Sequence, residues 1–91
     1  KHQKFQYGLG KSGHISDVVL IFPNEIKISI EVELSLKSKR RLEDIFRAYG
    51  GTLEYKEAWY FCADNVIRGV KSLVGNKSFI KVYSLKEFLN E

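Results

Sequence analysis

The feature that most constrains the fold is a change of hydrophobic period near Lys37. Apolar and polar residues alternate from residue 27 to residue 36, as they do in a β-strand whose two faces differ. Beyond this segment the apolar residues recur with the spacing of an amphipathic helix, at Leu42, Ile45, Phe46 and Tyr49. The sequence therefore predicts a strand, then a helix that begins after Ser38 as N-cap and ends at Gly50-Gly51.

The remaining elements follow from the same reading. Strands are predicted near residues 5–7, over 14–22, over 57–63 and over 79–85, with a turn at 23–25 that makes 14–22 and 27–36 a hairpin. A second helix is predicted from a cap at Asp64 or Asn65 to Gly75-Asn76, and residues 86–91 form a short helical end.

The order of these elements is strand, strand, strand, helix, strand, helix, strand. Strands that pair first and then alternate with helices imply an α/β or α+β fold, in which a small mixed β-sheet is flanked by helices. The 91 residues suffice for a single domain. Because the chain begins at Lys1 without a leader, we expect residues 1–91 to be a domain excised from a longer protein.

Composition limits the cellular locations and partners expected for the protein. A single cysteine, Cys62, rules out an internal disulfide and a cysteine-based zinc cage, which favours a cytoplasmic location. The longest apolar runs are too short to cross a membrane, so no membrane partner is expected. The net charge of +4 is consistent with a nucleic-acid partner but is common in unrelated small proteins.

Three carboxylates are predicted to meet at one end of the hairpin. Glu31 and Glu33 stand roughly 7 Å apart on one face of their strand. A turn centred near Asn24 places Asp17, on the neighbouring strand, opposite Glu31. Such a density of hard oxygen ligands suits Mg²⁺ or Mn²⁺. The alternative is that Glu31 and Glu33 form a solvated strand face paired with Lys27, Lys37 or a neighbouring strand.

An Asp on one strand, Glu-x-Glu on the next and then a helix resemble the core of the PD-(D/E)XK nucleases. More narrowly, H-I-S-D at 14–17, I-E-V-E-L-S-x-K-S at 30–38 and the Tyr-Gly helix end at 49–50 resemble domains of that superfamily in plasmids and other mobile elements. The replication-relaxation proteins are the nearest of these, and plasmid mobilisation proteins are of the same type. The resemblance covers residues 14 to about 62. It implies a restriction-endonuclease-like core and a Mg²⁺- or Mn²⁺-dependent deoxyribonuclease.

The resemblance assigns roles to four residues. Asp17 and Glu31 would be the first and second metal ligands. Glu33 would stand where many members have a lysine, as a further metal ligand or as the general base. Lys37 would be the substitute for that lysine. Two features depart from the family pattern: Ser16 replaces the usual proline, and the leading helix of the core is absent or lies upstream of Lys1.

A basic segment follows the acidic residues. The candidate contacts to DNA phosphates are Lys37, Lys39, Arg40, Arg41 and Arg47. The alternative is that these cations form an ordinary solvated helix face. The position of the segment beside the candidate metal site favours the interpretation that it contacts DNA.

Three function classes stay open from the sequence. The first is a metal-dependent DNA endonuclease that serves replication, relaxation or mobilisation of a mobile element. The second is a catalytically inactive domain of the same fold that binds DNA or a protein. The third is a small interaction domain without a nucleic-acid role. The resemblance further implies an upstream winged-helix domain, and the oligomeric state is left open, with a homodimer among the alternatives.

Overall fold

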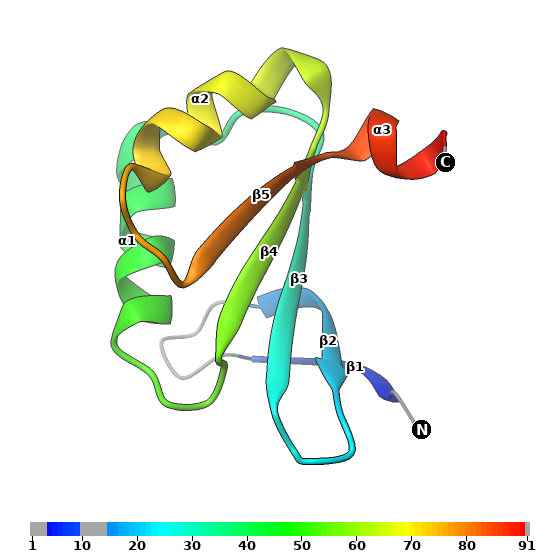
Figure 1. Ribbon diagram of the computed structural model, residues 1–91. Coiled ribbons are helices and arrows are strands. Elements are labelled where there is room, and N and C mark those ends of the chain that lie inside the picture. The colour runs from blue at the N-terminus through cyan, green and yellow to red at the C-terminus, as the bar shows by residue number, and fades with distance from the viewer. Residues whose placement is uncertain (1–3, 10–14, 91) are drawn as a thin grey trace.

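The computed structural model describes residues 4–9 and 15–90, and its elements follow the predicted order (Figure 1). The elements are β1 (Lys4–Leu9), β2 (Ile15–Ile21), β3 (Lys27–Glu33), α1 (Lys39–Gly50), β4 (Glu57–Cys62), α2 (Asp64–Val74), β5 (Ile80–Ser84) and α3 (Leu85–Leu89). His14 of the H-I-S-D motif lies outside the described residues.

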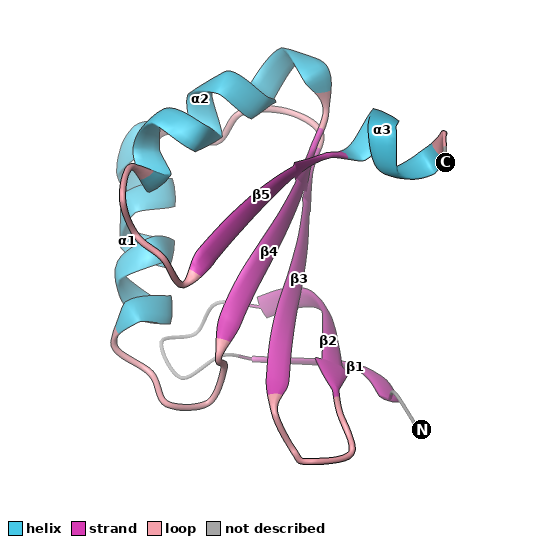
Figure 2. Cartoon of the chain, in the orientation of Figure 1, coloured by secondary structure: helices cyan, strands magenta, loops and turns pink. Residues whose placement is uncertain are grey.

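The strands form one mixed sheet in the order β1-β2-β3-β4-β5. The first three strands are an antiparallel meander, whereas β4 and β5 each run parallel to the strand before them. Helices α1 and α2 form the two crossovers of the parallel part and lie on the same side of the sheet (Figure 2), as crossovers of one hand between consecutive strands require. The predicted α+β class, a small mixed sheet with helices packed on it, is confirmed.

The core lies between the two helices and the parallel half of the sheet. The predicted stripe of α1 is buried as expected, and Leu42 and Phe46 have no exposed surface. The Phe46 ring meets Tyr60 of β4 edge-on, with ring centroids 5.4 Å apart. Val66 and Val70 of α2 complete this cluster. Apolar burial of this kind is the main favourable term in folding.

The ends of the helices agree with the sequence in one case and differ in the other. Ser38 caps α1, and its side chain accepts a hydrogen bond from the backbone N–H of Arg41. The predicted cap of α2 at Asp64 or Asn65 is wrong, because Ala63 occupies the N-cap position without a side-chain bond. The backbone N–H of Ala63 bonds to the carbonyl of Glu33, so strand pairing continues to Ala63 and fixes where the helix can begin.

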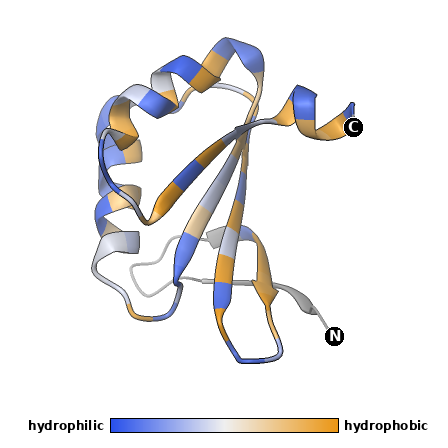
Figure 3. Ribbon diagram, viewed as in Figure 1, coloured by the Kyte–Doolittle hydropathy of each residue, from blue (hydrophilic) through white to orange (hydrophobic). Residues whose placement is uncertain are grey.

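The faces of β3 are the unexpected feature of the fold. Ser29, Glu31 and Glu33 are buried on the side that α1 and α2 cover, with exposures of 0, 3 and 4%. Val32 on the opposite side is 40% exposed. Figure 3 shows the alternation of hydropathy along the strand. The strand ends at Glu33 rather than near Leu36, because the chain leaves the sheet there to enter α1.

The other face of the sheet carries aromatic side chains that no described helix covers fully. Tyr83 of β5 lies between Trp59 and Phe61 of β4, at centroid distances of 5.9 and 5.3 Å. Phe88 of α3 packs on Phe61 at 4.9 Å. Tyr83 remains 41% exposed and Phe88 58% exposed. The apolar residues of this sheet are therefore divided between a closed face and a partly open one.

Two glycines in and after α2 give a matched test of the helix. We expect Gly69→Ala to raise the free energy of unfolding by about 0.5–1 kcal/mol, because alanine is the better helix former. The added methyl would approach the side chain of Leu36 to 3.2 Å, and Leu36 is exposed enough to yield. We expect Gly75→Ala to lower that free energy by about 1–2 kcal/mol, since Gly75 has a φ of +58°. Urea denaturation of both variants measures the two signs, and equal signs would contradict this account.

Candidate metal and nucleic-acid site

The hairpin brings Asp17 to β3 in the predicted register. Val18 of β2 pairs with Ile30 of β3, and this is the last pair of the register, one residue before Asp17. Asp17 is exposed, whereas Glu31 and Glu33 are buried. The register expected from a turn near Asn24 is confirmed.

The Asp17 carboxylate replaces a backbone partner at the point where strand pairing stops. The recorded pairing of β2 with β3 ends at Val18 and Ile30. Beyond this point Asp17 Oδ2 accepts a hydrogen bond from the backbone N–H of Val32 at 2.7 Å. Since Val32 lies between the two glutamates in sequence, this bond holds the exposed Asp17 carboxylate beside the Glu-x-Glu segment.

Glu33 forms an ion pair with Lys37. Lys37 Nζ donates to Glu33 Oε2, and the two side chains are 25% and 5% exposed. The turn from β3 into α1 brings Lys37 back over the end of its own strand. Lys27, the other cation weighed as a partner, instead lies 3.9 Å from Glu54. Pairing with Lys37, which belongs to the alternative interpretation of this acidic face, therefore occurs for Glu33.

Glu31 is held by a hydroxyl group of α1. The Tyr49 hydroxyl donates to Glu31 Oε2, and Ser29 Oγ lies 2.6 Å from the same hydroxyl. All three residues are buried. A buried carboxylate is strongly destabilising unless donors surround it. The alternative that Glu31 and Glu33 lie on a solvated strand face is therefore wrong.

The site collects carboxylates and a lysine, but it holds no ready-made metal cage. Within residues 4–9 and 15–90, no group of three or more His, Cys, Asp or Glu side chains is close enough to hold a metal ion. Asp17, Glu31 and Glu33 nevertheless each accept a defined hydrogen bond, from the Val32 N–H, the Tyr49 hydroxyl and Lys37 respectively. Oxygen donors of this kind match Mg²⁺ or Mn²⁺ in their chemistry.

The predicted DNA contacts divide into two groups. Lys39, Arg40 and Arg41 are exposed in the first turn of α1, next to Lys37. Arg47 lies in the last turn, where its guanidinium bonds to Asp44 Oδ1 at 2.9 Å. Arg47 comes eight positions after Lys39, which corresponds to about 12 Å along the helix. Four of the five cations thus lie in the segment from Lys37 to Arg41 that follows β3, and Lys37 contacts Glu33, whereas Arg47 lies apart.

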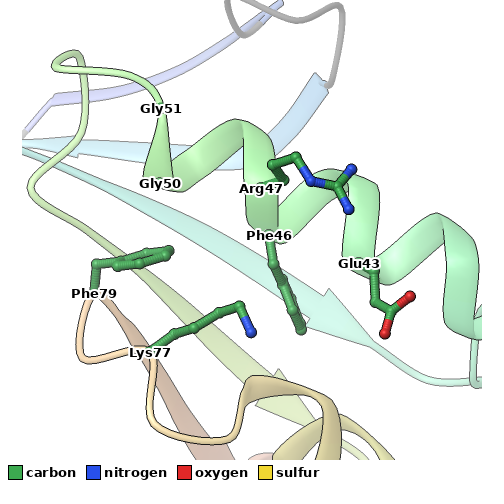
Figure 4. Close-up of a pocket in the computed structure, with 7 residues that line it drawn as sticks. All are labelled: Glu43, Phe46, Arg47, Gly50, Gly51, Lys77 and Phe79. Carbon is green, nitrogen blue, oxygen red and sulfur yellow. The ribbon is translucent and has the colours of Figure 1, made fainter.

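Arg47 instead borders a pocket at the far end of α1. The pocket measures about 540 Å³ and lies between α1 and the segment that precedes β5 (Figure 4). Phe46, Gly50 and Gly51 contribute from the side of α1, together with Glu43 and Arg47, and Lys77 and Phe79 face them from the other side. Both charge signs occur at its rim.

Sequence reasoning missed three residues of the acidic end. Tyr49 belongs to the predicted apolar stripe of the helix, and this spacing gives no sign that the hydroxyl reaches β3. Ser29 shares the parity of the glutamates, which is the one signal that could have placed it with them. Tyr60 pairs in register with Glu31, and its hydroxyl is buried without a hydrogen-bond partner among the described residues.

Burial also determines the protonation of Cys62, the single cysteine of the chain. The Cys62 thiol is fully buried beside Glu33, to which it is paired in register. Burial, and then the charge of Glu33, raise the pKa of Cys62 from its ordinary value of 9.0 to about 11, although Lys37 and Lys71 oppose the rise. The thiol therefore stays protonated in the folded protein under conditions where an unfolded thiol ionises.

This shift predicts a pH dependence of stability. Between the unfolded and folded pKa values the unfolded chain loses the thiol proton and the folded chain keeps it, so stability falls as pH rises. We expect the free energy of unfolding of the wild type, relative to that of Cys62→Ala, to fall by about 2–3 kcal/mol from about pH 8 to about pH 11. Urea denaturation in the presence of a chelator measures this difference. The Ala variant removes the thiol and keeps the other titrating groups. A constant difference would contradict the prediction.

Comparisons with known proteins assign no function to the site. No family model, curated protein or solved structure matches the chain. Within the part of the chain that the structure describes, no helix has the length and apolar character needed to span a membrane. The residues at the end of β3 and their geometry are therefore the basis for assigning a function.

Proposed function

We propose that this chain is a divalent-metal-dependent DNA endonuclease domain that hydrolyses phosphodiester bonds. The observation that carries the proposal is the hydrogen bond from the Val32 N–H to Asp17. This bond brings a carboxylate from a second strand to the Glu-x-Glu segment, at the place where Lys37 returns to Glu33. Acidic ligands from two strands beside a lysine suit metal-assisted phosphodiester hydrolysis.

The carboxylates of Asp17, Glu31 and Glu33 would hold Mg²⁺ or Mn²⁺. Their chemistry fits such an ion, because all are hard oxygen donors with negative charge. When bound, the ion supplies an activated water and stabilises charge on the phosphate.

The other groups act on the DNA and on protons. Glu33 is the candidate general base, and its carboxylate forms an ion pair with Lys37. Lys37 also offers a cation to a phosphate oxygen. Lys39, Arg40 and Arg41 bind the DNA backbone from the first turn of α1, where they are exposed.

One observation favours a second candidate function. Both glutamates already accept hydrogen bonds from protein groups, Glu31 from Tyr49 and Glu33 from Lys37. A site whose acids serve only these internal bonds would belong to a catalytically inactive domain that binds DNA or a protein. Such a domain would use the basic start of α1 without cleaving the strand.

The cellular setting follows from the resemblance to PD-(D/E)XK domains of mobile elements. We place the protein in the cytoplasm, in the replication, relaxation or mobilisation of a plasmid or related element. The same resemblance implies a DNA-reading winged-helix domain upstream of this one. A homodimer would present two sites to the two strands of a duplex.

The nuclease proposal predicts metal-dependent nicking of supercoiled plasmid. With Mn²⁺ the wild type should nick, and Asp17→Asn and Glu31→Gln should each lower the rate at least 100-fold, because each removes a charged ligand of the ion. Asp44→Asn is the matched control, since Asp44 is an exposed carboxylate that bonds to Arg47 on α1. Wild type that does not nick, while it binds DNA, would favour the inactive domain. Nicking that survives both substitutions would contradict the assigned ligands.

The basic start of α1 predicts a salt-dependent affinity for DNA. Each phosphate contact contributes about 0.9 to the slope of log K against log salt concentration. Replacing Lys39, Arg40 and Arg41 by Ala should make the slope shallower by about 3, measured by fluorescence anisotropy on a duplex. Arg47→Ala should leave the slope nearly unchanged, well short of the roughly 0.9 of one phosphate contact, because Arg47 lies at the other end of α1 and bonds to Asp44. Equal effects per charge would show that the whole helix contacts DNA.

A further inference from the structure

We infer that Tyr49 is a positioning residue, which fixes the Glu31 carboxylate in the orientation that a divalent cation requires. The inference rests on the proposed function, since it concerns how one of the proposed ligands is held. Tyr49 touches neither substrate nor ion in this account, and it acts through Glu31.

The hydrogen bonds around Tyr49 have a single consistent direction. The tyrosine hydroxyl has one proton, which it donates to Glu31 Oε2. The 2.6 Å contact between Ser29 Oγ and the same hydroxyl must then have Ser29 as its donor. Ser29, Tyr49 and Glu31 thus form a directed chain of donors that ends on a carboxylate oxygen. Bonds to a charged acceptor are the stronger ones.

The position of the Tyr49 ring is set by packing rather than by this chain. Tyr49 belongs to the buried stripe of α1, and only 7% of its surface is exposed. Its ring meets Tyr55 edge-on, with centroids 5.7 Å apart. A hydroxyl on a ring held in this way gives Glu31 a fixed donor instead of an adaptable one.

Tyr60 provides a contrast within the same core. It pairs with Glu31 in the β3–β4 register and is buried, as Tyr49 is. Its hydroxyl nevertheless has no hydrogen-bond partner in the part of the chain that the structure describes. Removing the Tyr60 hydroxyl therefore deletes one oxygen from the same region of the core, but it removes no hydrogen bond to Glu31. The same Tyr→Phe substitution can be made at both positions, and only the substitution at Tyr49 removes a hydrogen bond to Glu31.

Groups that orient a metal ligand influence the affinity for the metal without contacting it. Loss of such an outer partner typically weakens metal binding 10- to 100-fold. We therefore expect Tyr49→Phe to weaken Mn²⁺ binding within that range, and Tyr60→Phe to leave it within about twofold. Ser29→Ala removes one donor further along the chain and should weaken binding about fivefold, the equivalent of one hydrogen bond.

The experiment measures Mn²⁺ affinity by electron paramagnetic resonance, without DNA, for the wild type and the three variants. Thermal unfolding in chelator first establishes that each protein is folded at the measuring temperature. If Tyr49→Phe does not fold, Ser29→Ala carries the test, because it leaves the tyrosine ring in place. The spectrum of the bound ion reports on its ligands, which a loss of packing alone would not change.

Each outcome has one meaning. Weaker binding in Tyr49→Phe and Ser29→Ala, with Tyr60→Phe close to wild type, supports the positioning role. Wild-type affinity in the first two variants overturns this role and leaves the nuclease proposal intact if the wild type binds Mn²⁺ and nicks plasmid. Equal weakening in both tyrosine variants also overturns it, because the effect is then one of core packing. A wild type that binds no Mn²⁺ overturns both proposals.

Discussion

The hydrogen bond from Tyr49 to Glu31 and the ion pair of Lys37 with Glu33 allow two carboxylates to lie beneath α1. Without these donors each buried carboxylate would lower stability by several kcal/mol. The two donors come from opposite ends of the helical segment, since Lys37 precedes α1 and Tyr49 lies in its last turn. Helix α1 and the residues that precede it are thereby tied to β3 by two polar contacts, while Leu42 and Phe46 of α1 are fully buried in the apolar core.

The position of the site follows from the topology of the sheet. A meander of three strands places β2 beside β3, and the parallel crossover then carries the chain over the end of β3. Asp17 arrives from the meander, Lys37 from the crossover, and the two glutamates from the strand that belongs to both. The basic first turn of α1 begins at the same end. Acidic and basic groups therefore meet where antiparallel and parallel pairing join.

Much of this arrangement could be predicted from local patterns. The change of period at Lys37, the Ser38 cap and the hairpin register are properties of short segments, and the structure agrees with them. The direction in which β3 faces could not be predicted, because alternation shows only that two faces differ. Which face becomes covered depends on the crossovers and on β4, whose Ala58, Tyr60 and Cys62 bring the buried apolar surface. The role of Tyr49 depends on that same long-range choice.

The inward polar face of β3 has a consequence for how the chain folds. A slip of one residue in strand pairing would turn Ile30 and Val32 toward the helices and release Glu31 and Glu33 to water. By hydrophobicity alone this alternative is the more favourable one, so the folding landscape contains a competing register. The native register gains its advantage when α1 docks and delivers the Tyr49 hydroxyl to Glu31. The acidic residues thus introduce local frustration, which the contacts of Tyr49 and Lys37 offset in the native structure.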